Sequence, residues 1–231
     1  MIIGIIGAME EEVSGLEEKL EGEKEAVYAG MRFLTGSIGG RKVALVCSGI
    51  GKVNAAVAAT ILVERFHADC ILNTGIAGGI APEVKLGDVV LSTDCQEHDF
   101  DVTAFGYEKG CIPRMKTSTF PADQRLLELA KSCEEELSSG VTVHTGRVLS
   151  GDLFVSSREK KEELYRDFHG ICCEMEGAAI AHTAYLYGVP YLVIRAISDQ
   201  ADMTATENYA AFEAQAIENF LALTLHMLAA L

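Results

Sequence analysis

The sequence predicts an α/β fold, because short β-branched runs alternate with longer helical segments along the whole chain. Residues 193–197 (VIRAI) have the composition of a strand buried on both faces. They follow an apolar helix expected over residues 177–187, which Gly188 and Pro190 end. The 231 residues contain no linker, repeat or low-complexity segment. We therefore expect one domain over residues 1–231.

The same patterns place the other elements in order. Buried strands are expected at residues 1–7, 70–74, 89–92, 145–150 and 191–197. Two antiparallel strands, residues 27–37 and 42–48, are expected to join at Gly39 and Gly40. Loops are expected at the glycine-rich residues 75–79 and at residues 105–113. Helices are expected to open at Glu10 and to cover residues 53–66, 123–137, 159–166, 177–187 and 206–231.

Charge and composition narrow the class of ligand and the compartment. The net charge is −15, whereas a nucleic-acid partner requires clustered Lys and Arg. A neutral or cationic small molecule fits better. The apolar first residues lack a basic flank, and the seven cysteines have no CxxC spacing. We expect reduced thiols in the cytoplasm, with no membrane segment and no nucleic-acid partner.

Three candidate motifs, for a dinucleotide, a phosphate loop and a metal, lack the residue spacing that these sites require. Gly4 and Gly7 do not form the GxGxxG of a dinucleotide-binding turn, which argues against a dehydrogenase. Gly51 and Lys52 lack the other residues of an NTPase phosphate loop. His98 stands among aspartates without further ligands at a recognisable spacing, so we expect neither a metal nor a cofactor.

Acidic residues stand at the ends of predicted strands. Asp199 follows the buried strand at the edge where open α/β sheets bind ligands, and burial there would let it act as a general acid. For Glu12 the residues alone favour a surface role at a helix N-terminus, with an inward-facing role as the alternative. Glu174 and Glu176 are two residues apart, so at most one is expected in the site, and its neighbour is expected to pair with Arg195.

Seven motifs, in register along the chain, resemble the 5′-methylthioadenosine/S-adenosylhomocysteine nucleosidases of the nucleoside phosphorylase/hydrolase family. They are GIIGAMEEE (4–12), SGIGKV (48–53), NTGIAGG (73–79), DVTAFGY (101–107), SGDLF (150–154), EME (174–176) and RAISD (195–199). The resemblance implies a three-layer αβα sandwich with a central mixed, partly barrel-like sheet, and a homodimer. It implies hydrolysis of the N-glycosidic bond of both thionucleosides, and of 5′-deoxyadenosine, in methionine salvage and the removal of methyl-cycle by-products, without metal or redox cofactor.

The resemblance also implies roles for individual residues. Glu12 corresponds to the base that activates water, Asp199 to the acid that protonates adenine N7, and Arg195 to a group that positions the water. Glu176 corresponds to the carboxylate that holds the ribose hydroxyls. The residues that match base and sugar contacts are Met175, Gly78, Phe154 and Val155. Those that match the surround of the alkylthio tail are Ile50, Tyr209, Phe105 and Pro113, of which the last two would come from the other subunit. The expected site also includes Met9, Ala77 and Ser198.

The chain departs from the family pattern at two positions, and three alternative functions remain. Ile76 stands where the family is expected to carry a small polar residue, and Tyr209 stands where it often carries Phe. A nucleosidase preferring 6-amino-6-deoxyfutalosine would use the same acid and base. A nucleoside phosphorylase is less compatible, because Glu10, Glu11 and Glu12 occupy the helix N-terminus that would otherwise favour an anion. A binding module without chemistry is disfavoured by the intact acids.

Overall fold

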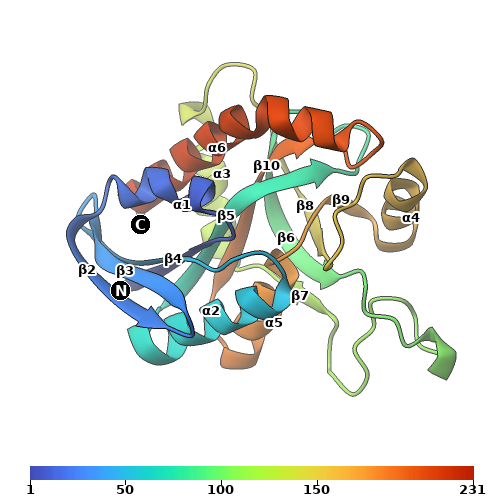
Figure 1. The fold of residues 1–231 in the computed structure, drawn as a ribbon, viewed down its shortest axis with the longest axis horizontal. Coiled ribbons are helices and arrows are strands. Elements are labelled where there is room, and N and C mark those ends of the chain that lie inside the picture. Colours follow the sequence, from blue (N-terminus) through green and yellow to red (C-terminus); the bar gives the residue numbers. More distant parts are fainter.

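A ten-stranded mixed β-sheet forms the centre of the molecule (Figure 1). The computed structural model describes residues 1–231, except for the side chain of residue 136. Its strands run in the order β10-β6-β8-β9-β5-β1-β4-β3-β2, with β7 beside β6. Their bounds are β1 Ile2–Gly7, β2 Glu21–Tyr28, β3 Met31–Ile38, β4 Arg41–Cys47, β5 Cys70–Gly79, β6 Val89–Glu97, β7 Thr119–Pro121, β8 Val143–Ser150, β9 Gly170–Glu174 and β10 Tyr191–Asp199.

One end of this sheet closes on itself. Strand β5 pairs with β1, with β9 and, in parallel, with β10, so that β5, β10, β6, β8 and β9 form a five-stranded barrel. Glycines permit the tight packing: a Cβ on Gly170 would lie 2.4 Å from a Leu149 methyl, and one on Gly146 would lie 2.6 Å from Ile171. The prediction of a mixed, partly barrel-like sheet is confirmed.

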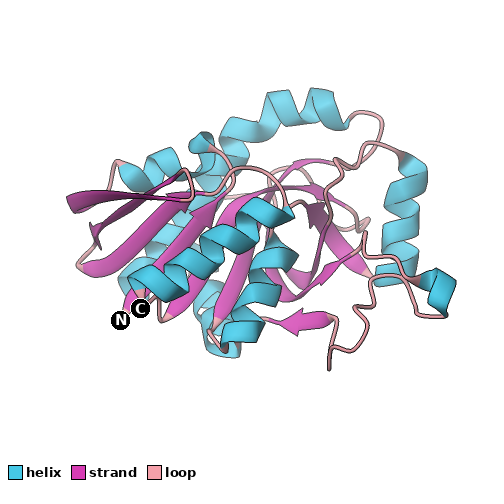
Figure 2. Cartoon of the chain, turned by 60° about the horizontal axis from the view of Figure 1, so that its bottom comes forward, coloured by secondary structure: helices cyan, strands magenta, loops and turns pink.

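Helices cover both faces of the sheet, as expected for three layers (Figures 1 and 2). The helices α1 (Glu10–Glu17), α3 (Gln124–Ser132) and α6 (Ala205–Ala230) lie on one face, α2 (Lys52–Phe66) and α5 (Gly177–Tyr187) on the other, and α4 (Arg158–Phe168) near the barrel. No described helix combines the length and apolar character needed to cross a membrane.

The two layers of core follow the alternation of the strands. Ile3 on β1 packs in the same cluster as Phe220 of α6, whereas Ile6 packs in the cluster that contains Leu62 of α2 and Ile180 of α5. Successive side chains of a strand point to opposite faces, so residues 2–7 supply both layers. This explains why the buried strands are nearly continuous apolar runs.

Three expected elements differ in the structure. Residues 27–37 are not one strand: β2 and β3 meet in a tight turn at Ala29 and Gly30, and β2 was missed because its residues are polar and exposed. Residues 75–79 are not a loop but the buried end of β5. The helix expected over residues 123–137 ends at Ser132 and is followed by a short 3₁₀ helix.

The turn between β2 and β3 offers a test of this backbone geometry. Ala29 has φ 50° and Gly30 has φ 77°, the left-handed pair required by a type I′ hairpin. Asparagine tolerates this conformation better than alanine does. We expect Ala29→Asn to raise the free energy of unfolding by up to about 1 kcal/mol, measured from the urea midpoint. The companion change Gly30→Ala should lower it, and an unchanged midpoint for both would contradict the hairpin.

Candidate active site

A cavity of about 370 Å³ opens at the carboxyl ends of β1, β5, β9 and β10. This is the sheet edge at which the sequence placed Asp199. Most of the wall is apolar, while carboxylates and Ser198 bring polar groups to it. Its lining consists of Ala8, Met9, Glu12, Ile50, Ile76, Ala77, Gly78, Phe154, Cys173, Glu174, Met175, Glu176, Ser198, Asp199, Thr206 and Tyr209.

Glu12 lies in the cavity wall rather than on the surface, with 5% of the residue exposed. It is the third residue of α1, and its carboxylate folds back to accept hydrogen bonds from the backbone N–H of Ala8 (2.7 Å), Met9 (3.2 Å) and Ile76 (3.0 Å). Burial raises the pKa of Glu12, while the Arg195 cation and these N–H groups oppose the rise. The surface role favoured by the residues alone is therefore wrong for Glu12, although Glu10 and Glu11 are exposed.

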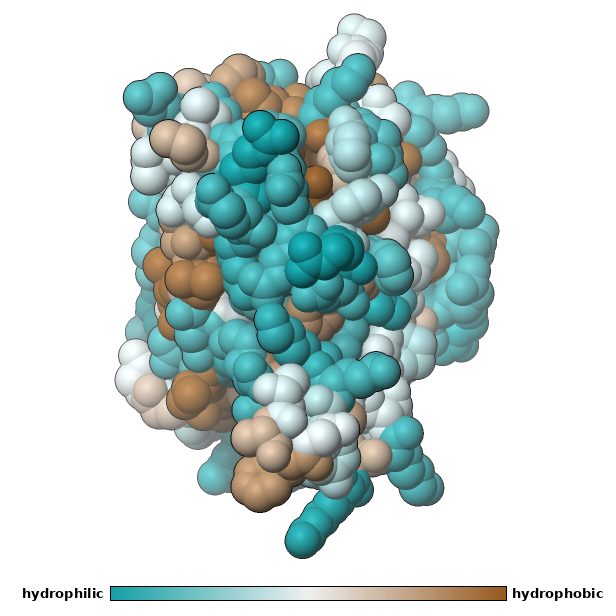
Figure 3. Space-filling model, turned by 90° about the vertical axis from the view of Figure 1, so that its right-hand side faces the viewer, coloured by the Kyte–Doolittle hydropathy of each residue, from teal (hydrophilic) through white to brown (hydrophobic). Residues whose placement is uncertain are grey.

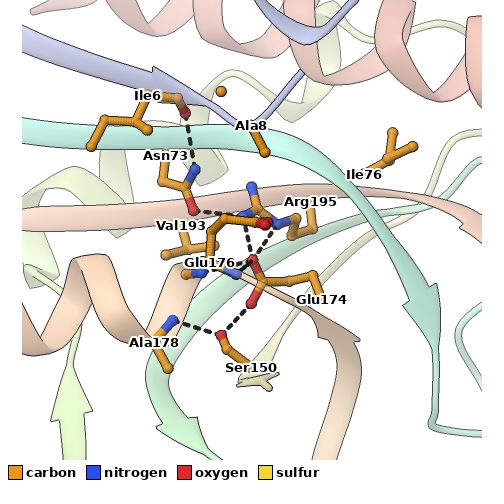
Figure 4. A network of polar contacts seen from close by, with 12 residues as sticks. Ile6, Ala8, Asn73, Ile76, Ser150, Glu174, Glu176, Ala178, Val193 and Arg195 are labelled. Carbon is orange, nitrogen blue, oxygen red and sulfur yellow. Dashed lines mark hydrogen bonds and ion pairs between the residues drawn. The ribbon is translucent and has the colours of Figure 1, made fainter. Parts of the chain in front are cut away.

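Arg195 lies behind the cavity at the centre of a polar network (Figure 4), and 1% of it is exposed. Its guanidinium donates to Oε2 of Glu174, through Nε at 3.2 Å and through Nη2, and Nη2 also donates to the Asn73 amide oxygen at 2.6 Å. Burial acts to lower the pKa of Arg195, but the carboxylates around it, Glu174 first, raise it. Arg195 is therefore a permanent cation.

The partner carboxylate of Glu174 is saturated with hydrogen bonds. It accepts the Ser150 hydroxyl and the backbone N–H groups of Glu176 (3.1 Å) and Gly177 (2.7 Å), besides the guanidinium (Figure 4). The predicted pairing of Arg195 with one of the two glutamates is thus confirmed. The expectation that only one of them would reach the site is wrong, because Glu174 and Glu176 both line the cavity.

Glu176 is a carboxylate of the cavity whose protonation is strongly changed by its surroundings. It precedes α5, and its Oε1 accepts the backbone N–H of Gly51 at 2.8 Å. Burial, followed by the nearby charge of Glu174, raises the pKa of Glu176 to about 7. The carboxylate therefore changes charge near neutral pH.

Asp199 ends β10 and is 3% exposed. Its Oδ1 accepts the N–H of Ala201 at 2.7 Å, and its Oδ2 accepts the Ser198 hydroxyl at 3.0 Å. Burial raises its pKa, partly offset by these two hydrogen bonds. A Cβ on Gly78 would lie 2.8 Å from Oδ1, so the glycine is what lets the carboxylate approach β5.

Two positions on β5 shape the space beside Glu12. A Cβ on Gly75 would lie 2.4 Å from the Glu12 carboxylate and 3.1 Å from Nη1 of Arg195, so no side chain separates the acid from the cation. Ile76 holds Glu12 through its backbone, while its side chain lines the cavity and packs into the core. The cavity wall next to Glu12 is therefore apolar at this position.

The remaining expected residues are placed as follows. Val155 is buried and lines a smaller adjoining cavity, together with Phe154 and Gly78. Phe105 is 83% exposed and, like the half-buried Pro113, is absent from the lining contributed by this chain. Ala8, Cys173 and Thr206 were not expected in the site. Ala8 could have been found as the neighbour of Met9, whereas Thr206 carries no motif and reaches the cavity through the placement of α6.

Among the described residues, no group of three or more His, Cys, Asp or Glu could hold a metal ion. Cys172 and Cys173 lie in β9 without a disulfide. The ionisable groups of the site are thus carboxylates, one buried cation, a thiol and the Tyr209 phenol. Such a set can give and accept protons.

Comparisons with known proteins agree with this geometry. The family model of the phosphorylase superfamily matches residues 2–229. A 5′-methylthioadenosine/S-adenosylhomocysteine nucleosidase from an Exiguobacterium species is 43% identical over 213 residues, which are 92% of this chain and 91% of the relative. The crystal structure of the corresponding Neisseria meningitidis nucleosidase, in complex with methylthio-immucillin-A, is 39% identical with a TM-score of 0.95, over 100% of this chain and 99% of that one.

A second similar structure has a different name. A futalosine hydrolase mutant of Helicobacter pylori is 31% identical, with a TM-score of 0.95 and all of both chains covered. Sequence and structure therefore converge on one assignment: the chain belongs to the phosphorylase superfamily and, within it, to the 5′-methylthioadenosine/S-adenosylhomocysteine nucleosidases.

Proposed function

We propose that the protein hydrolyses the N-glycosidic bond of 5′-methylthioadenosine and S-adenosylhomocysteine, and of 5′-deoxyadenosine, releasing adenine and the corresponding ribose. The observation that carries the proposal is the convergence of Glu12, Glu176 and Asp199, all buried and all with a raised pKa, on one largely apolar cavity. A cavity of about 370 Å³ is within the size range of small-molecule sites. Its apolar wall suits a neutral nucleoside with a thioether tail.

Asp199 serves as the general acid. Adenine is a poor leaving group as an anion, so the Asp199 proton passes to N7 while the electron pair of the C1′–N9 bond moves into the purine. Burial raises the pKa of Asp199 and so retains the proton toward neutral pH. Ser198 and Ala201 fix the direction of the carboxyl group by their hydrogen bonds.

Glu12 serves as the general base. The sugar develops oxocarbenium character, water forms the new C1′–O bond, and Glu12 accepts the proton that the water loses. Asp199 has lost one proton and Glu12 has gained one, so exchange with solvent restores both, and one water is consumed per turnover. Arg195, with no side chain between it and Glu12, orients the water and favours the ionised base.

The other residues bind the substrate. Glu176 accepts hydrogen bonds from the ribose hydroxyls, Met175 packs on the sugar, and Gly78, Ala77, Phe154 and Val155 surround the base. Met9, Ile50 and Tyr209 line the tail. The Tyr209 hydroxyl donates to Glu213 at 2.9 Å, and its ring lies edge-on to Phe154 with centroids 6.5 Å apart. This hydroxyl places a polar atom near the tail, where a phenylalanine would be wholly apolar.

A homodimer completes the site in this proposal. Phe105 and Val53 are exposed apolar residues, and Ile50 at the cavity mouth is 54% exposed. A second copy would cover such surface, with its Phe105 and Pro113 closing the tail pocket. We place the enzyme in the cytoplasm, in methionine salvage and methyl-cycle by-product removal, because its substrates are by-products of S-adenosylmethionine chemistry.

The two related activities fit less well. A phosphorylase must bind phosphate, yet the described lining contains carboxylates and neither Lys nor Arg. Because the chain is similar to a futalosine hydrolase, 6-amino-6-deoxyfutalosine is the second candidate substrate. That substrate shares the adenine and ribose, so only the tail pocket separates the two activities.

The direct test is product analysis with the purified protein. Incubation with 5′-methylthioadenosine should yield adenine and free methylthioribose at the same rate with and without phosphate. Asp199→Asn, which keeps the shape but cannot protonate N7, should lower kcat by about 10²–10⁴-fold. Exposed Asp69→Asn serves as the control. A sugar 1-phosphate product would contradict the hydrolase, and turnover of aminodeoxyfutalosine alone would move the substrate assignment.

The raised pKa of Glu176 predicts a pH-dependent cost to stability. In the unfolded chain its pKa is near 4.5, whereas in the fold it is about 7, so the folded state loses stability as pH rises through this window. Glu176→Gln removes the ionisation and should raise the melting temperature more at pH 8 than at pH 5. The gain at pH 8 should be on the order of 3 kcal/mol at most. Thermal unfolding at both pH values measures it, with exposed Glu23→Gln as the control; an equal shift at both would contradict the assignment.

A further inference from the structure

The segment that follows Asp199 is held from outside the cavity by one lysine. Lys161 projects from α4, on the side of the molecule that Figure 3 shows as mainly hydrophilic. Its ammonium donates to the backbone carbonyl of Gln200 at 2.6 Å and lies 3.4 Å from the Gln200 side-chain oxygen. The mechanism above makes no use of this contact.

The carbonyl that Lys161 holds belongs to the peptide unit that faces the acid. The N–H of that same unit is the Ala201 N–H, which donates to Asp199 Oδ1 at 2.7 Å. In a planar trans peptide the C=O and N–H point in opposite directions. Fixing the oxygen on the α4 side therefore fixes the direction of the N–H on the cavity side. A cation on the carbonyl also polarises the unit and strengthens its N–H as a donor.

This short segment is strained, so it needs such a restraint. Ala201 is fully buried with φ 51°, a left-handed conformation that is unfavourable for a residue with a Cβ. A Cβ on Gly78 would lie only 3.0 Å from the Ala201 methyl, so the segment packs closely against β5 because residue 78 is a glycine. Lys161 restrains the segment from the side of α4.

We propose that Lys161 is a positioning residue for Asp199, acting through the peptide unit between Gln200 and Ala201. This inference rests on the proposed function, in which Asp199 is the acid that protonates adenine. Lys161 does not touch the substrate cavity, since it lines a separate cavity with Asp202 and Tyr165. It thereby couples the charge of α4 to the orientation of the acid.

The charges around Asp199 define the expected pH effect. The groups that face it are Asp202 on its own segment, which raises its pKa, Lys161 on α4, which lowers it, and the Cys173 thiol on β9. Across the cavity stand Glu12, Glu176 and Tyr209. Loss of Lys161 removes a cation and weakens the N–H bond, and both changes raise the pKa of Asp199. The acid then stays protonated to higher pH, so the alkaline limb of the kcat/KM profile moves to higher pH.

The experiment compares Lys161→Met with Lys161→Arg and with Lys160→Met, in the full-length protein. Lys160 is the matched control, because it is the adjacent residue of α4 and its ammonium pairs instead with Glu163 at 3.3 Å. Gln200 is half-buried, so water can hydrate its carbonyl when Lys161 is lost, and the variant can fold. Thermal unfolding of each variant verifies this.

Two substrates separate positioning of the acid from a general structural effect. One is 5′-methylthioadenosine, which needs the acid, and the other is the 4-nitrophenyl glycoside of 5-methylthioribose, whose leaving group departs as an anion. For Lys161→Met we expect kcat on the nucleoside to fall roughly 10-fold, less than the ~10²–10⁴-fold expected when the acid itself is removed. KM should stay unchanged, and the alkaline limb of the kcat/KM profile should move to higher pH. The rate on the glycoside should change less than about twofold. Lys161→Arg should restore most of the nucleoside rate.

The outcomes distinguish this inference from the proposed function. If wild type releases adenine and Asp199→Asn does not, but Lys161→Met behaves like Lys160→Met, the positioning role is overturned and the function stands. Equal loss on both substrates would also overturn it, since that indicates general damage to the site. If wild type releases no adenine from 5′-methylthioadenosine, the proposed function itself fails.

Discussion

The buried guanidinium of Arg195 is the constraint on which the rest of the structure depends. A cation at that depth requires compensation, because an unpaired buried charge costs several kcal/mol. Glu174 on β9 and Asn73 on β5 supply it, while Ser150 on β8 holds Glu174. Counting β10, which carries Arg195, one network joins four of the five barrel strands. Pairing of the barrel strands therefore also brings together the groups that compensate this charge.

The network also determines where the reactive groups lie. Glu174 orients the start of α5 by accepting the N–H groups of Glu176 and Gly177, and so places Glu176 at the cavity wall. The cation opposes the effect of burial on Glu12, whose carboxylate meets three backbone N–H groups that are already in place. The proposed base is thus held in its orientation before substrate arrives, which would lower the reorganisation required in the transition state. The fold bears the cost of concentrating acids in an apolar cavity.

The sequence revealed those features that follow from local pattern. Apolar runs rich in β-branched residues identified β1 and β10. The need of a buried Arg195 for a partner indicated its pairing with one of two glutamates. The sequence pattern did not predict the structure at positions where contacts between distant segments determine it. The polar β2 is a strand only because β3 pairs with it, and the glycines at residues 75–79 read as a loop although β9 and β10 hold them in the barrel. The inward turn of Glu12 depends on the Ile76 N–H, 64 residues away in sequence.

The position of β10 in the barrel has a consequence for biosynthesis. This strand inserts between β5 and β6. Its residues are separated from their pairing partners in those two strands by about 100 residues or more of sequence. While the ribosome is still making the C-terminal fifth of the protein, those two neighbours expose open edges, and such edges invite pairing with other chains. The strand that seals them also delivers Asp199, the last of the three acids to be synthesised. A chain that stalls before this point is open to aggregation and also lacks its proposed proton donor, so the proposed catalysis requires completion of the barrel.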